Sequence, residues 1–504
     1  MEDPENSSSF FEESYEHISS FFSNSKPDST LKKANEDQEE IKVERSKDTL
    51  CCHIYSVIDN ACEDPFIFIV NAEKINESNS KHFTVYTIHM RNFEVRRRYS
   101  EFESLRISLS RLFPTVIVPP IPEKSNINLS ISSARAKRDS NIVNQRKRML
   151  QVFLNRCVFH PVLSKSHVFH CFLDDNISWQ QVLITPPISL LPQNILISHP
   201  LDPISSTNNP NYQCLPIPSA NAKLINSNNK DEVKFLELEK KIKEIEDIIG
   251  TGILKANRYI IKHFQNLADH FSELGATYNA LSIIGPDHLA AGIERFGQAH
   301  DSNFHSNYEL IENMNFILSE PLKELAQFHE AARSRLIYRR QKTVQYEIIV
   351  DILNQNKNIL DTLEKSEIEA QKIESSLARL STGGSSLSTL NSDESIDDNE
   401  HSKQTKNFFG KLTVAIKDMV DADSKTTRKK SIEKIYEKIS QLENALKITR
   451  KDSNVAAEAI MDELERFQSA IRKNYCDLMI NVGKCYIEWA KRNIKVWEKA
   501  NCLA

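Results

Sequence analysis

A helical hydrophobic period that continues through most of the second half of the chain is the feature that most limits its fold. From about residue 234 onward, apolar residues recur at intervals of three and four, first in Phe235, Leu238, Ile242, Ile245 and Ile249. The pattern returns in 344–363 and again in 432–482. A helix is expected from about 286 to 380, bent at Pro321, and at 1.5 Å per residue it would extend on the order of 140 Å. The sequence therefore predicts long helices that are too extended for a compact bundle.

The composition agrees with a helical protein and excludes several function classes. Only 10 of the 504 residues are glycine, which argues against turn-rich β-architectures and glycine-rich nucleotide loops. The 64 Lys and Arg against 69 Asp and Glu give a net charge of -5, so no global basic field favours nucleic acid. No apolar run approaches the roughly 18 residues of a membrane span, and the cysteines show no paired C-x-x-C pattern. We expect a reduced, cytoplasmic protein.

Changes in composition divide the chain into four parts. Residues 1–47 are acidic and rich in Ser and Asn, and are expected to form a disordered tail. Residues 48–175 carry mixed strand and helix patterns, which predicts a small α+β domain. Residues 176–230 hold eight of the 18 prolines and predict a linker that packs in part on its neighbours. Residues 231–504 predict an all-α domain of three long helices, with a disordered insert at about 381–406.

The α+β domain is expected to contain three short strands followed by helices. The strands are predicted in 49–59, 65–70 and 83–90, and the helices in 100–113, 141–158 and 164–173. Its basic residues fall in three separate elements: Arg96–Arg98 beside Tyr99, the proline-rich connector 118–124, and Arg146–Arg148. Guanidinium and ammonium groups that surround one phosphorylated polyol would use such an arrangement. Each basic run by itself is better explained as a solvated face.

The same motifs, in this order, resemble the phox-homology (PX) domain of the sorting nexins. They are RRYSEF (97–102), FP (113–114), PPIPEK (119–124), the spacing of Arg146, Leu150 and Phe153, and HPVL followed by FHCFL. The resemblance implies a three-stranded antiparallel sheet with helices that binds phosphatidylinositol 3-phosphate. In this interpretation Arg98 holds the 3-phosphate, Tyr99 supports the inositol ring, Lys124 faces the 1-phosphate and Arg146 binds the 4- and 5-hydroxyls.

Two apolar segments are candidates for membrane insertion. Ile127, Leu129 and Ile131 alternate on a polar background ahead of basic residues, although a half-buried strand would show the same alternation. Phe408, Phe409 and Leu412 share one helical face, which fits either an interfacial helix or packing inside the helical domain.

The helical region resembles a BAR (Bin/amphiphysin/Rvs) domain, which is a three-helix antiparallel dimer that lies on curved membranes. The basic run 333–342 would supply charge to the membrane, and a solvated helix face is the alternative. The insert and the segment after it are similar to the fungal autophagy-related subgroup of sorting nexin-41 and autophagy-related protein 20. A PX-BAR sorting nexin is therefore the family that the sequence resembles.

This resemblance implies a peripheral membrane adaptor that binds phosphatidylinositol 3-phosphate and senses or shapes curved endosomal membrane. It would act in endosome-to-Golgi retrieval and selective autophagy, on endosomes and the preautophagosomal structure. Its partners would be a sorting nexin-4-like chain as heterodimer, or a second copy as homodimer, and autophagy scaffold proteins. The alternative is a cytosolic coiled-coil scaffold whose PX-like domain mainly binds protein.

Signals for catalysis are weak, and no catalytic residue, cofactor, metal ligand or nucleic-acid partner is expected. The phosphate-binding and nucleophile motifs G-x-x-x-x-G-K-[ST], G-x-G-x-x-G and G-x-S-x-G are absent. The histidines His160, His167 and His170 are expected to be structural.

Overall fold

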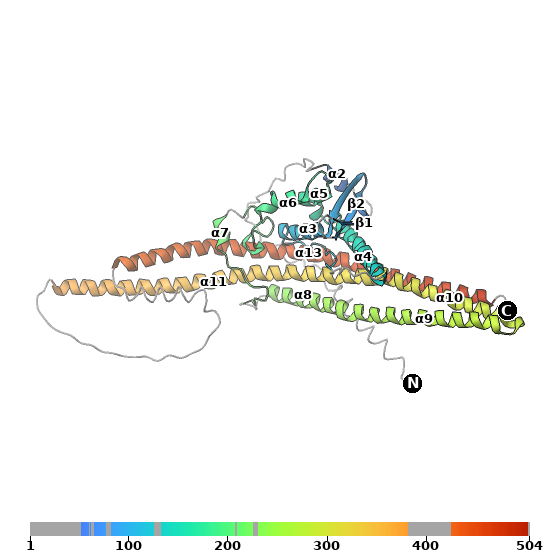
Figure 1. Cartoon of the computed structure of the whole chain (residues 1–504). Coiled ribbons are helices and arrows are strands. Elements are labelled where there is room, and N and C mark those ends of the chain that lie inside the picture. Colours follow the sequence, from blue (N-terminus) through green and yellow to red (C-terminus); the bar gives the residue numbers. More distant parts are fainter. Residues whose placement is uncertain are drawn as a thin grey trace, which may run out of the picture. The chain divides into compact units, whose positions relative to one another are not determined.

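The computed structural model in Figure 1 describes most of the chain. The described residues are 52–59, 61, 65–76, 82–124, 133–206, 209–224, 230–381 and 425–501. They fall into two compact units: the first comprises the residues up to 207 together with 227–339 and 455–504, and the second comprises 208–226 and 340–454.

A three-stranded antiparallel sheet forms the centre of the N-terminal domain in the first unit. The strands are β1 (Phe68–Asn76), β2 (His82–Met90) and β3 (Phe93–Arg98), in the order β1-β2-β3. The register of β3 pairs Arg98 with Val85 and Arg97 with Tyr86. Because side chains alternate along a strand, Val95 and Arg97 are buried while Arg96 is exposed. The predicted α+β class with three antiparallel strands is confirmed.

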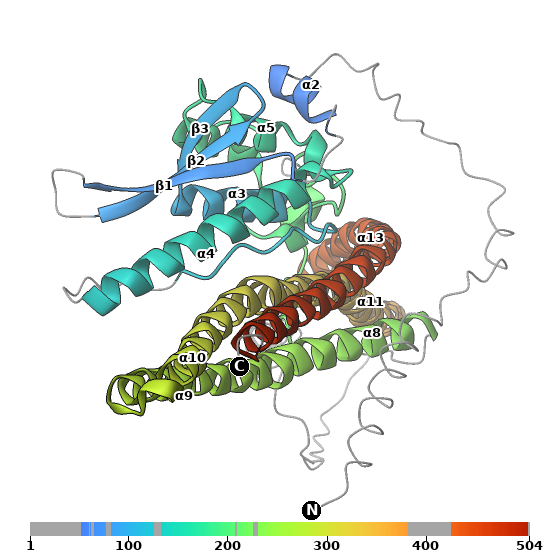
Figure 2. The same cartoon turned by 90° about the vertical axis from the view of Figure 1, so that its right-hand side faces the viewer.

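Helices α3 (Tyr99–Leu112), α4 (Ser133–Val158) and α5 (His167–Leu173) complete the core of this domain. Figure 2 shows α3 and α4 on one side of the sheet. The side-chain amide of Asn155 in α4 accepts the N–H groups of Phe66 (2.7 Å) and Ile67 (2.8 Å) and donates to the Ile67 carbonyl (2.8 Å). These buried hydrogen bonds hold α4 to the start of β1, since an unsatisfied amide would be costly there.

The predicted strand at 49–59 is wrong, because the described part of this segment contains helix α2 (His53–Asp59). Ile54 and Ile58 are 1% and 4% exposed and lie one helical turn apart, so a single helical face enters the core. The third strand is instead β3, which leads directly into α3. A short apolar run of this length fits both periods, and packing decides between them.

The proline-rich segment after α5 packs as short helical turns. Helix α6 (Trp179–Ile184) and the 3-10 turns η2 (Ile188–Leu190) and η3 (Ile195–Ile197) follow one another. The Trp179 indole is 2% exposed and its N–H donates to the Ser104 hydroxyl at 2.7 Å. Ile188 and Leu191 join the hydrophobic core of the sheet domain.

The C-terminal half contains three long helices, as predicted. The first comprises α8 (Lys230–Asp247), the π-helical η4 (Ile248–Ile253) and α9 (Leu254–Ile284); the second comprises α10 (Asp287–Met314), the π-helical η5 (Asn315–Ser319) and α11 (Glu320–Ser381); and the third is α13 (Lys425–Asn501). Pro321 follows the π-helical turn η5. Its ring lacks an N–H and crowds the carbonyl of Ile317, which explains the irregular turn there.

The periodic apolar residues of α13 pack inside the chain. Ile460, Leu464, Phe467 and Ile471 are each at most 4% exposed and belong to one buried cluster of the first unit. The Phe467 ring lies 5.0 Å from that of Phe328, edge to face. In this part of α13, the helical period of apolar residues therefore reflects packing within one chain.

Glu463 of α13 connects the helices of the first unit to the sheet domain. Its carboxylate accepts the backbone N–H of Ile117 (2.8 Å) and the Nε–H of Arg466 (3.0 Å), and lies 3.3 Å from Nε2 of His160. Although burial raises the pKa of Glu463, the hydrogen bonds from His160 and Arg466 hold it below its usual value. Burial lowers the pKa of His160, which favours the neutral imidazole in the folded chain.

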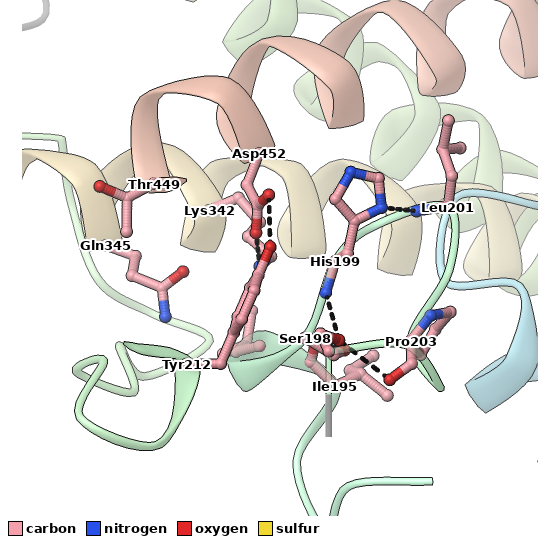
Figure 3. A network of polar contacts seen from close by, with 12 residues as sticks. Ile195, Ser198, His199, Leu201, Pro203, Tyr212, Lys342, Gln345, Thr449 and Asp452 are labelled. Carbon is pink, nitrogen blue, oxygen red and sulfur yellow. Dashed lines mark hydrogen bonds and ion pairs between the residues drawn. The ribbon is translucent and has the colours of Figure 1, made fainter. Parts of the chain in front are cut away.

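Lys342 and Asp452 form a buried ion pair in the second unit (Figure 3). Lys342 Nζ lies 2.9 Å from Asp452 Oδ2, and the two side chains are 0% and 1% exposed. The Tyr212 hydroxyl, from α7 (Pro210–Gln213), donates to Asp452 Oδ1 at 3.1 Å. Gln345 donates to the Pro216 carbonyl at 2.8 Å. Polar contacts thus tie the segment around α7 to α11 and α13.

We expect Asp452→Ala to lower the free energy of unfolding by about 3–5 kcal/mol, because the Lys342 ammonium would be left buried without its counter-ion. Urea denaturation followed by circular dichroism measures this change. Asp361→Ala is the matched control on α11, since Asp361 is 72% exposed and 4.0 Å from Lys365; it should change stability by about 0–1 kcal/mol. Equal effects of the two substitutions would contradict the importance of the buried pair.

Stability should fall as the pH falls from about 7 to 5. Below the usual histidine pKa of about 6.5, the unfolded chain binds a proton at His160 that the folded chain resists. Glu463 has a lowered pKa in the folded chain, so the stability that it contributes is lost only at lower pH. His160→Gln should reduce the slope of unfolding free energy against pH in this range, whereas His305→Gln, at an exposed position, should not. An unchanged slope in His160→Gln would show that His160 does not cause the pH dependence of stability.

Candidate functional site

Tyr99 and Arg146 form one wall of the candidate site. Tyr99 begins α3, and its hydroxyl donates to the Pro122 carbonyl at 2.5 Å, so the ring is held against the proline-rich connector. The Arg146 guanidinium carbon, from α4, lies 5.2 Å from the centroid of the Tyr99 ring. Arg146 also donates to the Glu123 carbonyl at 3.4 Å. The structure therefore brings together three of the predicted elements: the start of α3, the connector and α4.

A hollow of about 420 Å³ adjoins this wall. The sheet domain contributes Pro122, Glu123, Ile142, Gln145, Arg146 and Met149, and the long helices contribute Leu254, Lys323, Ala326 and Gln327. Arg146 and Lys323 give it two cationic side chains, with apolar groups between them. Such a concave surface suits a ligand that has both hydroxyl and anionic groups.

Arg98, the last residue of β3, lines a second hollow of about 290 Å³. Its backbone N–H donates to the Glu101 carboxylate at 2.9 Å, which ties the strand end to the first turn of α3. Its side-chain Nε is buried and has no hydrogen-bond partner among the described residues. Ser178 and Gln180 also line this hollow. Arg98 thus presents a buried donor beside a cavity, next in sequence to Tyr99.

Lys124 lies at the end of the described part of the connector. Its side chain is 66% exposed, and its ammonium is 4.0 Å from the Glu103 carboxylate. An exposed pair of this length contributes little to stability because solvent screens it. Lys124 is therefore available for contact with an anion at small cost.

Two of the three arginines in the run Arg96–Arg98 have partners within the sheet domain. Arg97 is 7% exposed and donates to the carbonyls of Phe172 (2.9 Å) and Asp174 (2.8 Å). Burial lowers its pKa. Arg96 instead pairs with Glu73 at 2.7 Å on the exposed face. Adjacent arginines of one run thus have different roles, because strand alternation sends them to opposite faces.

Several residues of the basic run 333–342 also serve the interior, so the expectation that this run supplies membrane charge is wrong for them. Arg335 donates to the Pro114 carbonyl at 2.9 Å, and burial lowers its pKa to about 10. Arg339 is 5% exposed and pairs with Glu232. Lys342 is fully buried. Buried charges of this kind need internal partners and cannot face a membrane.

Both groups of candidate insertion residues lie outside the described part of the chain. They are Ile127, Leu129 and Ile131, and Phe408, Phe409 and Leu412.

The first long helix carries an exposed apolar stripe that was not predicted from the sequence. Ile253, Ile260, Leu267, Leu274 and Leu281 are spaced by seven residues, and each is between 36% and 46% exposed. On α13, Ile480 and Ile487 are also spaced by seven and are each 54% exposed. A search for exact seven-residue repeats would have found them, since such repeats are typical of a helix that packs on another chain.

None of the helices in the described ranges combines the length and low polarity needed to cross a bilayer. The sequence profile of the PX domain matches residues 85–176, which include most of β2 and all of β3, α3, α4 and α5. The cryo-EM structure of the SNX-BAR Mvp1 tetramer has a similar fold, with a TM-score of 0.50 and 15% identity over 86% of this chain and 99% of that chain.

Two curated proteins extend the similarity over most of the chain. Sorting nexin-41 of Yarrowia lipolytica is 40% identical over 446 residues, covering 86% of this chain and 78% of that protein. Autophagy-related protein 20 of Gibberella zeae is 34% identical over 512 residues, covering 86% of this chain and 83% of that protein. The chain therefore belongs to the PX-BAR sorting nexins, in the subgroup of sorting nexin-41 and autophagy-related protein 20, which are non-enzymatic adaptors associated with membrane traffic.

Proposed function

We propose that the chain recruits itself to endosomal membrane by binding phosphatidylinositol 3-phosphate through Arg98, Tyr99, Lys124 and Arg146. The contact between Tyr99 and Arg146 is the observation that carries this proposal. It joins an aromatic face, suited to a sugar-like ring, to a guanidinium that can donate to ring hydroxyls. The hydrogen bond from Tyr99 to Pro122 fixes that face before the ligand arrives, which reduces the entropy lost on binding.

Arg98 supplies the strongest phosphate contact in this proposal. Its Nε is buried without a partner among the described residues, and a phosphate oxygen would satisfy it in a charge-assisted hydrogen bond. Arg98 and Arg146 line separate hollows, so we expect the headgroup to draw the two side chains toward Tyr99 when it binds. Lys124 adds an exposed point charge, whose effect should be smaller.

The exposed stripe on η4 and α9 supports the dimeric part of the proposal. Five apolar residues at seven-residue spacing form a continuous seam, and a second BAR-type helix with the same repeat would cover it. The second chain is either another copy or a sorting nexin-4-like partner. Two headgroup sites on one dimer would raise membrane affinity by avidity without a new contact.

In the cell this adaptor would act in endosome-to-Golgi retrieval and selective autophagy, on endosomes and the preautophagosomal structure. Autophagy scaffold proteins are proposed as further partners. The similarity to sorting nexin-41 and to autophagy-related protein 20 supports these roles. A cytosolic scaffold that binds protein through its PX domain remains the alternative, and lipid-dependent flotation separates the two.

Arg98→Ala should weaken binding to vesicles that contain phosphatidylinositol 3-phosphate by about tenfold to a hundredfold, because one charge-assisted contact to phosphate is lost. Flotation of the full chain with vesicles that contain or lack this lipid measures the effect, and circular dichroism checks the fold. Lys74→Ala is the matched control on the same sheet, since Lys74 is an exposed cation of β1 that is not among the residues lining either hollow. Flotation independent of the lipid in the unmodified chain would favour the scaffold, and equal losses in the two variants would remove Arg98 from the site.

Leu267→Asp should separate the dimer, because a carboxylate at the centre of the stripe would be buried without a partner. We expect the dissociation constant to rise by at least a hundredfold. Light scattering after size exclusion gives the mass, for the chain alone and coexpressed with a sorting nexin-4-like chain. Ile283→Asp is the control, since Ile283 is 86% exposed and lies off the seven-residue repeat. A dimer that survives Leu267→Asp would contradict the proposed seam.

A further inference from the structure

Two histidines and one cysteine, far apart in the sequence, meet at the junction of α2 and α5. Cys52 immediately precedes α2, while His167 and His170 lie on consecutive turns of α5. One potential ligand atom from each residue lies within 4.8 Å of those of the other two. In a tetrahedral zinc site with bonds of about 2.0–2.3 Å, ligand atoms are roughly 3.3–3.8 Å apart. Movements of about an ångström would therefore bring all three to one ion.

The hydrogen bonding of His170 indicates which nitrogen would bind the ion. Its Nε2 lies 2.6 Å from the carbonyl oxygen of Ser164, and a carbonyl only accepts, so Nε2 carries the proton. The lone pair is then on Nδ1, which is buried and has no partner among the described residues. The whole side chain is 0% exposed. Metal-binding histidines almost always donate their second N–H to a carbonyl or carboxylate in this way.

The other two ligands have complementary properties. The Cys52 thiol is free and partly buried, and thiolate sulfur is a preferred zinc ligand. His167 is exposed, and its ring centroid lies 6.3 Å from that of His170, with the ring planes at 83°. The exposed side of His167 leaves room for water at a fourth position.

We propose that Cys52, His167 and His170 bind one zinc ion, with water as the fourth ligand, and so fasten α2 to α5. Binding deprotonates the Cys52 thiol, whose sulfur forms the bond to zinc, and the proton passes to solvent. The ion holds Ile54 and Ile58 of α2 in the core of the sheet domain. The site is separate from Arg98, Tyr99, Lys124 and Arg146, so its role is structural.

The test uses the full chain, stripped of metal with a chelator and titrated with Co²⁺, whose d–d bands report tetrahedral geometry and whose near-ultraviolet charge-transfer band reports a thiolate ligand. We expect one Co²⁺ per chain with both bands, displacement of Co²⁺ by Zn²⁺, and a rise in thermal stability with Zn²⁺. Absence of a tetrahedral spectrum in the unmodified chain would overturn the proposal.

The matched pair of variants is Cys52→Ser and Cys51→Ser, which change adjacent cysteines. Cys52→Ser should lose the charge-transfer band and weaken metal binding at least tenfold, whereas Cys51→Ser should bind as the unmodified chain does. His170→Gln should lose the tetrahedral d–d bands, and if it does not fold, the cysteine pair still decides. A charge-transfer band that persists in Cys52→Ser, or that disappears only in Cys51→Ser, would overturn the assignment of Cys52.

Discussion

The need to pair every buried charge decides which basic residues of this chain remain for a ligand. Burial without a counter-ion or hydrogen-bond partner is costly, and the interior contains carboxylates at Glu232, Asp452 and Glu463. Arg339 and Lys342 are used to balance two of them. These two side chains are therefore occupied inside the fold, and the basic run 333–342 offers a membrane fewer cations than its composition suggests.

The same constraint links recognition to stability. Arg98 and Arg97 are neighbours in β3, yet Arg97 donates to carbonyls after α5 while the Arg98 Nε is left without a partner among the described residues. Replacing Arg97 would disturb the core, whereas replacing Arg98 would remove the contact that we propose it makes with the ligand. Of these two adjacent arginines, Arg97 thus stabilises the fold, while Arg98 serves the proposed function.

The predicted fold class was confirmed because long helices and a PX motif order leave strong patterns in a sequence. The helix from about 286 to 380 was predicted nearly to the residue, since its apolar period is long and Pro286 precedes it. The strand predicted at 49–59 was wrong because a short apolar run fits both the helical and the strand period. The packing of Ile54 and Ile58 in the core favours the helix. The apolar period alone could not separate the buried face around Ile471 from the exposed stripe around Leu267.

The sequence by itself determined the two kinds of domain, the positions of the long helices and the motif that contains Arg98 and Tyr99. These features depend on local periodicity and on residues close together in the chain. The tertiary structure decided how charges pair and how distant residues meet. His167 and His170 alone predict a structural role, and only folding brings Cys52 to them from more than a hundred residues away. Contacts of that separation depend on packing of α2 against α5, which local sequence does not encode.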